Sequence, residues 1–291
     1  MPSTPVVVLD STLTNIANAI RSKTGGSATM KPGQMPAQIA SIPSGGGVGI
    51  PREVSAQGVY QIPSQSFAFS LPAGATAVGE RALNGAFRDC TSLTSVDLSP
   101  LTAVSASSAL YNAFYGCTSL TSVNLSSLAT VSGSSAFNGA FRNCTSLTSV
   151  NLSSLTTVSG SSAFGDAFRD CTSLTSVNLS SLTTASTLNA FNSAFRNCTS
   201  LTSVNLSSLT TVSAGWVLAE AFSGCASLTS LSFPALTPSS FVPYTNQFNS
   251  MLNGCSNVTV HFPAAIQSTI GSWASVTGGF GGTNTTVLFD L

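Results

Sequence analysis

The strongest constraint on the fold of this chain is a repeat of 27 residues. The apolar skeleton of one unit, Ala140 to Val158, reads A-F-x-x-C-x-x-L-x-x-V-x-L-x-x-L-x-x-V, and the other units follow it closely. Repetition at a fixed period of this length is typical of solenoids, in which each unit forms one coil that stacks on the next. The cysteines that recur every 27 residues are Cys90, Cys117, Cys144, Cys171, Cys198 and Cys225, and Cys255 follows after a spacing of 30.

The V-x-L step of each unit predicts a short β-strand. Val150 and Leu152 are two residues apart, so both side chains point to one face of the strand, while Ser149 and Asn151 point to the other. A single coil cannot close its own core. Stacked coils place Leu on Leu and Phe on Phe, and their strands pair in a parallel sheet at about 4.8 Å per coil. The fold class predicted from the repeat is therefore a solenoid.

Both ends of the repeated region look like caps, as terminal coils must. Phe69 and Leu71 carry the strand step in a first unit that lacks a cysteine, and Met251 to Cys255 fits the repeat only loosely. We expect a helical attachment or oligomerisation segment at 1–44, a Gly-rich linker and lead-in at 45–65, the solenoid at 66–262, and a C-terminal cap at 263–291.

The unit A-F-x-x-C-x-x-L-x-x-V-x-L resembles the BspA-like, treponemal class of bacterial leucine-rich repeats, over roughly residues 66–262. The resemblance implies a right-handed leucine-rich-repeat coil with one short parallel strand per 27-residue unit. Adhesins, surface antigens and phage-borne proteins share this class. Exported members usually carry a signal peptide, whereas Met1 to Pro5 has no basic region and Asp10 ends the short apolar run that follows. A surface protein of this kind would need a non-standard export route.

The N-terminal segment predicts two short helices. Leu13, Ile16 and Ile20 lie on one stripe of the first helix, and Met35 and Ile39 mark the second. Helices this short are not stable alone. Their apolar stripes either pack on each other or on the solenoid, or they are buried in a partner or in copies of the same chain. We assign these five residues to attachment.

Part of that segment resembles the start of many phage and prophage tail-associated proteins. The matching phrase is L-x-x-I-A-x-A-I-R-x-K-T-G, from Leu13 to Gly25, followed by K-P-G-Q-M-P-A-Q-I. The resemblance implies that the segment binds other tail or virion proteins. A virion protein is made in the host cytoplasm and released by lysis, which agrees with the lack of an export signal.

The low charge of the chain excludes several partners. Only 6% of the residues are charged, and nine Lys and Arg balance nine Asp and Glu, so no net field attracts nucleic acid or anionic lipid. No stretch approaches the roughly 18 apolar residues that cross a bilayer, so we expect no membrane insertion. A surface of neutral hydroxyls and amides suits a protein exposed outside a cell or on a virion.

The residues that usually carry catalysis or bind metal have a structural explanation here. Each cysteine has the same inward environment as its neighbours, so the column fills the core, and no C-x-x-C pair or His cluster indicates zinc. His261 is the only histidine, and it is expected to point outward from the last repeat. We expect no enzymatic activity and no cofactor.

Three sets of residues are candidates for ligand binding, each with a structural alternative. Four arginines could form a basic stripe for an acidic glycan or a protein, or pair locally with the Asp and Asn residues beside them. The outward asparagines could form a polar platform, or only solvate the sheet. Aromatic residues near the start of the units could line a binding rim, or fill the convex side. The three sets are Arg88, Arg142, Arg169 and Arg196, with Tyr115 at the same position in its own unit; Asn124, Asn151, Asn178 and Asn205; and Tyr111 and Trp216.

Together these features predict a tail-associated structural or receptor-binding protein of a phage or prophage, located in the virion tail. Its solenoid would recognise a glycan or protein on the host surface, and homo-oligomers are possible through the N-terminal helices. The alternative is a bacterial cell-surface adhesin of the leucine-rich-repeat class.

Overall fold

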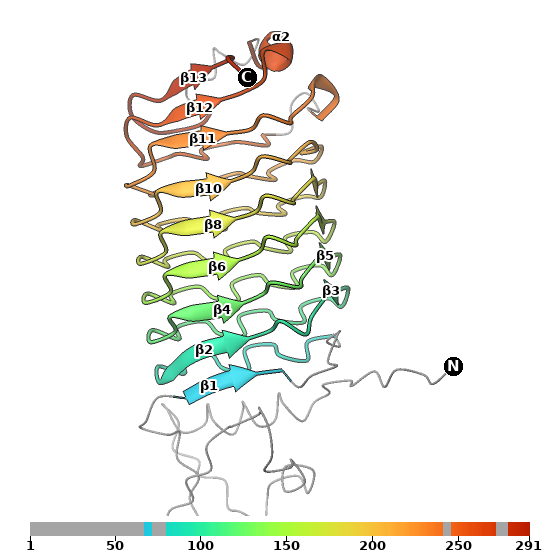
Figure 1. Ribbon diagram of the computed structural model, residues 1–291, viewed down its shortest axis with the longest axis vertical. Coiled ribbons are helices and arrows are strands. Elements are labelled where there is room, and N and C mark those ends of the chain that lie inside the picture. Colours follow the sequence, from blue (N-terminus) through green and yellow to red (C-terminus); the bar gives the residue numbers. More distant parts are fainter. Residues whose placement is uncertain (1–66, 72–79, 241–245, 272–278) are drawn as a thin grey trace, which may run out of the picture.

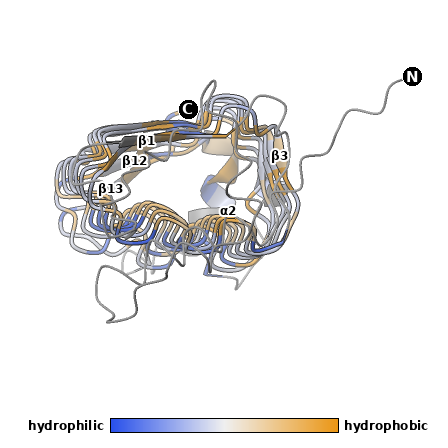
Figure 2. Cartoon of the chain, turned by 90° about the horizontal axis from the view of Figure 1, so that it is seen from below, coloured by the Kyte–Doolittle hydropathy of each residue, from blue (hydrophilic) through white to orange (hydrophobic). Residues whose placement is uncertain are grey.

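The computed structural model describes residues 67–71, 80–240, 246–271 and 279–291, and these form a parallel β-solenoid. The strands stack one above the other along the long axis of the molecule, from β1 to β13 (Figure 1). Seen along that axis, each coil is a flattened ring, with β1, β12 and β13 on one long side and β3 at one end (Figure 2). The predicted fold class is confirmed. The segments 1–44 and 45–65 and their expected helices lie outside the described residues.

The strand expected in each unit forms a six-stranded parallel sheet. Each strand lies one coil after the previous one. Val96 therefore pairs with Val123, and the pairing continues from Val123 to Val150, Val177 and Val204. In β6 the valine is buried and its neighbours Ser149 and Asn151 are exposed, which is the period of two read from the sequence. The strands of this sheet are β1 (Phe67–Ser70), β2 (Leu93–Asp97), β4 (Ser122–Asn124), β6 (Ser149–Asn151), β8 (Ser176–Asn178) and β10 (Ser203–Asn205).

A second parallel sheet, which the sequence did not indicate, runs along another side of the coils. Each of its strands has only two residues, too few to show an alternating pattern, and the second of them points inward, as Val131 and Val158 do. The strands are β3 (Ala103–Val104), β5 (Thr130–Val131), β7 (Thr157–Val158) and β9 (Thr184–Ala185).

The third side of each coil consists of tight turns. The N–H of Leu110 donates to the carbonyl of Ala136 in the next coil, and the N–H of Ala113 donates back to Leu110. Every fourth residue of this side has a positive φ, which favours Gly, Asn and Asp. The last such position of each coil holds only these types: Asp89, Gly116, Asn143, Asp170, Asn197, Gly224 and Gly254.

The core is built from columns of identical side chains. In the longest aromatic column the rings are nearly parallel, and neighbouring centroids lie 5.2–5.6 Å apart. Columns of leucine, valine and cysteine are buried beside it. One phenylalanine per coil thus fills the same space in each layer, and the column consists of Phe87, Phe114, Phe141, Phe168, Phe195 and Phe222.

The C-terminal coils form a separate three-stranded parallel sheet of β11 (Ser230–Ser232), β12 (Thr259–His261) and β13 (Thr286–Leu288). The 3-10 helices η3 (Pro238–Ser240) and η4 (Ala264–Ile266) and the short helix α2 (Gln267–Gly271) lie between its strands in sequence. Because β13 continues the ladder after β12, the parallel stacking extends into the expected cap. The domain boundary at residue 262 stays a prediction. Across the described ranges, no helix has the length and apolarity needed to cross a bilayer.

Candidate binding surfaces

The outward face of the six-stranded sheet carries the expected asparagine column, and part of each side chain has a structural role. The Oδ1 atom of Asn151 accepts a hydrogen bond of 3.1 Å from the N–H of Ser153, which closes the turn after the strand. The same bond recurs at Asn124, Asn178 and Asn205 at 3.1–3.2 Å. Each asparagine thus fixes the chain locally through its carbonyl oxygen and leaves its NH₂ group for solvent or a ligand.

Threonine hydroxyls just before the strands β4, β6, β8 and β10 tie each coil to the one before it. The Oγ1 atom of Thr121 donates to the carbonyl of Thr94, and Thr148, Thr175 and Thr202 repeat the contact at 3.0–3.3 Å. These side chains therefore reinforce the ladder and hold the exposed face in one arrangement. The sequence reasoning did not identify this function, because it requires the carbonyl of a residue one coil away.

A hollow of about 370 Å³ opens on the outward face between β8, β10 and β11. It lies where the six-stranded sheet stops at β10 and the C-terminal sheet begins at β11. Its ten lining residues are uncharged: Ser176, Val177, Asn178, Ser203, Val204, Asn205, Leu206, Ser207, Ser232 and Pro234.

The four candidate arginines all have partners. Arg88 lies 3.5 Å from Asp89, and Arg196 pairs with Glu220. The contact between Arg88 and Asp89 is the expected pairing of an arginine with the residue beside it. The partner of Arg196 differs from the expected one, because Glu220 comes from the next coil. The ion pairs on this side of the coils are partly exposed, so each contributes little to stability.

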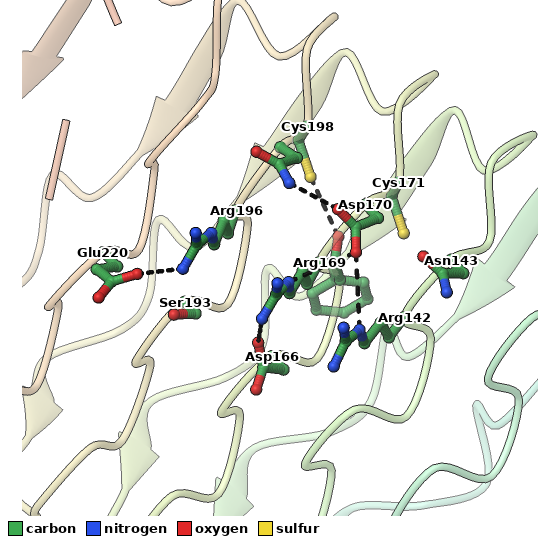
Figure 3. A network of polar contacts seen from close by, with 12 residues as sticks. Arg142, Asn143, Asp166, Arg169, Asp170, Cys171, Ser193, Arg196, Cys198 and Glu220 are labelled. Atoms are coloured by element: carbon green, nitrogen blue, oxygen red, sulfur yellow. Dashed lines mark hydrogen bonds and ion pairs between the residues drawn. The ribbon is translucent and has the colours of Figure 1, made fainter. Parts of the chain in front are cut away.

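Asp170 joins two of the arginines (Figure 3). Its carboxylate lies 3.7 Å from Nε of Arg142 and 3.5 Å from Nε of Arg169, and it accepts a 2.8 Å hydrogen bond from Nδ2 of Asn197. Arg169 also contacts Asp166 at 3.2 Å. Acidic side chains therefore neutralise the positive charge of the arginine column along its length. Whether it binds a ligand stays a prediction.

Tyr115 occupies the arginine position in its own coil and packs between two arginines. The guanidinium of Arg88 lies 4.6 Å from the centre of its ring and that of Arg142 lies 5.8 Å away, distances at which a cation is attracted to the ring face. Its hydroxyl oxygen accepts a 3.0 Å hydrogen bond from Nδ2 of Asn143. These contacts give Tyr115 a structural function in the column.

The other two aromatic candidates differ in exposure. Tyr111 is half-buried, whereas Trp216 is 38% exposed and has a φ of 58°, an unusual conformation for a bulky residue. Leu188, one coil earlier, is 51% exposed and was not identified from the sequence. The sequence does mark this residue, because the equivalent residues in the two preceding units are serines, Ser134 and Ser161.

The cysteines are free and buried, as expected of a core column, and they also donate hydrogen bonds. Sγ of Cys171 lies 3.1 Å from the carbonyl oxygen of Phe141 in the preceding coil. The same contact recurs at 3.1–3.2 Å in Cys117, Cys144, Cys198, Cys225 and Cys255. Burial raises the pKa of these thiols, so they stay protonated and unreactive.

His261 lies on β12, and its Nδ1 atom is 3.0 Å from both carboxylate oxygens of Asp290. No group of three His, Cys, Asp or Glu residues in the described part of the chain could hold a metal ion. The attachment residues Leu13, Ile16, Ile20, Met35 and Ile39 lie outside the described residues, so their assignment stays a prediction.

Coils of 27 residues, each with a buried leucine skeleton and one main strand, define the class of leucine-rich-repeat solenoids. The sequence profile of the BspA type leucine-rich repeat region matches residues 64–191 and 138–238. The chain belongs to the BspA-type leucine-rich repeat family. The resemblance read from the repeating unit is thus confirmed.

Several solved structures share similarity with the chain. A leucine-rich repeat protein of T. pallidum is 24% identical, with 76% of this chain and 87% of that chain covered and a TM-score of 0.46. A leucine-rich cell surface protein of Faecalibacterium prausnitzii is 16% identical, with 75% and 78% covered and a TM-score of 0.22. The pneumococcal vaccine antigen PcpA is 13% identical, with 82% of each chain covered and a TM-score of 0.25. A comparison with curated proteins found no match.

Proposed function

We propose that this chain is a non-enzymatic recognition protein, displayed on the bacterial cell surface in the manner of an adhesin. Its partner would be a glycan or a protein on a host surface. Membership of the BspA-type family supports this alternative over the tail-associated hypothesis. Leucine-rich-repeat solenoids usually act as binding scaffolds, and their chemistry lies in the surface they expose.

The observation that carries the proposal is the outward face of the six-stranded sheet. The same Ser and Asn side chains are exposed in register on β4, β6, β8 and β10. Main-chain ladders and threonine hydroxyls already hold this face in place. A ligand that binds such a surface loses little of its affinity to the ordering of side chains and loops.

Antibody labelling of intact producer cells tests the location. We expect antibodies against residues 64–238 to label intact cells, and protease treatment of those cells to remove the signal while a cytoplasmic marker protein is retained. Beads coated with the full chain should also adhere to host cells more than beads coated with an unrelated protein of similar charge. A protein found only inside unlysed cells would overturn the proposal.

The tail-associated hypothesis stays a second candidate because of the sequence phrase from Leu13 to Gly25 and its continuation through Ile39. It places the protein in purified phage particles released by lysis, attached through its N-terminal segment to other tail proteins. Mass spectrometry of gradient-purified particles and of the cell envelope from the same culture separates the two. Enrichment in particles favours the tail, and enrichment in the envelope favours the adhesin.

A further inference from the structure

The hollow between β8, β10 and β11 interrupts an otherwise regular face. Neighbouring strands of the six-stranded sheet are hydrogen-bonded from β1 through β2, β4, β6 and β8 to β10, but β10 and β11 are not hydrogen-bonded neighbours. Val204 on β10 is only half-buried, whereas its equivalent Val177 is 2% exposed. The floor of the hollow therefore offers apolar surface from Val204 and Pro234 that the other coils keep covered or lack.

Polar groups without protein partners surround that apolar floor. Asn178 and Asn205 use Oδ1 for the turns that follow their strands, and their NH₂ groups have no partner among the described residues. The hydroxyls of Ser203 and Ser232 are likewise unpaired within the described part of the chain. Two amides and several hydroxyls thus face a recess in which every lining residue is uncharged.

We propose that this hollow binds a neutral saccharide. The assignment rests on the proposed recognition function and names the class of ligand. A sugar ring presents hydroxyls at its edge and C–H groups on its faces, which match the amide and hydroxyl rim and the apolar floor. A volume of about 370 Å³ is at the small end of ligand sites and suits one or two sugar rings. An acidic glycan or a phosphate would find no cation here.

The repeats provide a matched control for testing the site. Asn205 lines the hollow, whereas Asn124 has the same position on β4, closes the same turn and lies outside the hollow. Asn205→Ala and Asn124→Ala therefore lose the same internal hydrogen bond but differ in their distance from the site. Ser203→Ala and Ser122→Ala form a second matched pair if one asparagine variant unfolds.

The experiment titrates the full chain with glucose, galactose, mannose, N-acetylglucosamine and their β-linked disaccharides, and follows backbone and side-chain amides by NMR. We expect saturable shifts confined to β8, β10 and the end of β11. Asn205→Ala should weaken binding about tenfold, the value of one ligand hydrogen bond, and Asn124→Ala should change it less than about twofold.

Three results would overturn the saccharide site. One is an equal loss of affinity in Asn205→Ala and Asn124→Ala, and another is a set of shifts that lie away from the hollow. The third is no binding of any neutral sugar. If any of these results is found while intact cells are still labelled and coated beads still adhere, the recognition function stands and the ligand binds elsewhere on the chain. The saccharide site and the recognition function can therefore fail independently.

Discussion

The cysteines of the core column fulfil two requirements at once, as Cys171 shows. The side chain of Cys171 fills a fully buried space, and its thiol reaches the carbonyl of Phe141 in the preceding coil. The same carbonyl also accepts the N–H of Cys144 at 3.2 Å. Alanine could occupy the position without a donor, and a larger apolar residue would crowd the column. Cysteine is both small enough and able to donate.

Replacing Cys171 with alanine removes the sulfur and leaves the Phe141 carbonyl with one donor instead of two. We expect Cys171→Ala to lower the free energy of unfolding by about 1–3 kcal/mol, measured by urea denaturation followed by circular dichroism. Ser173→Ala, two residues away at a half-buried position, should change it by less than about 0.5 kcal/mol. Similar midpoints for the two variants would mean that the thiol bond contributes nothing measurable.

The inward position of these residues could be predicted from the sequence, but their polar contacts could not. Periodicity places Cys171 in the core because its neighbours one unit away are identical. The partner of its thiol is a backbone carbonyl, which has no sequence signal. The pairing of Arg196 with Glu220 was missed for a related reason: the two side chains meet across coils, in a segment where the units differ.

At the level of the coil, close approach of neighbouring backbones determines where side chains fit. Gly133 and Gly160 lie at a corner after the two-residue strands β5 and β7. A Cβ atom on Gly160 would lie 2.2 Å from the carbonyl oxygen of Gly133 and 2.6 Å from its carbon, so the main chain would have to move. In the following coil, Thr187 stands at this position and its hydroxyl donates to the carbonyl of Gly160 at 2.9 Å.

Gly160→Ala should therefore separate two coils at this corner. We expect it to lower the free energy of unfolding by about 1–3 kcal/mol, the usual cost of forcing extra volume into a packed site. The neighbouring Ser159 is exposed, so Ser159→Ala should be nearly neutral in the same urea titration. Equal stability of the two variants would show that the corner relaxes without loss.

The main strand and the fold class were predictable because the V-x-L step repeats in every unit. The second sheet was not, since a two-residue strand such as Thr157–Val158 has no alternation to detect. The break between β10 and β11 was equally hidden. Its only sequence signal is the change from N-L-S-S-L to S-F-P-A-L, in which Pro234 replaces a serine.

For the whole molecule, the column of thiols makes stability depend on pH. Burial raises the pKa of Cys117, Cys144, Cys171, Cys198 and Cys225 in the folded chain, whereas unfolded thiols ionise near their ordinary value of about 8.5. Below about pH 8.5 the thiols are protonated in both the folded and the unfolded chain, so their contribution to stability is fully present. Above it, unfolding releases protons, so the folded state loses stability as the pH rises.

We expect the free energy of unfolding to fall between about pH 8.5 and pH 10, with each buried thiol adding up to about 1.4 kcal/mol per pH unit. Urea denaturation at several pH values under reducing conditions measures the slope. Cys171→Ala should show a shallower slope than the parent chain, by the contribution of one thiol. A free energy that is constant from pH 7.5 to pH 10 would contradict the linkage.

Equal register along the ladder also affects how such a chain can change over generations. Since Val123, Val150 and Val177 meet their neighbours in the same way, removing one whole unit of the interior would bring equivalent surfaces into contact. Recombination between the near-identical stretches of the gene should therefore yield shorter or longer variants that still fold. The length of the protein would then vary among related strains, with the end coils unchanged.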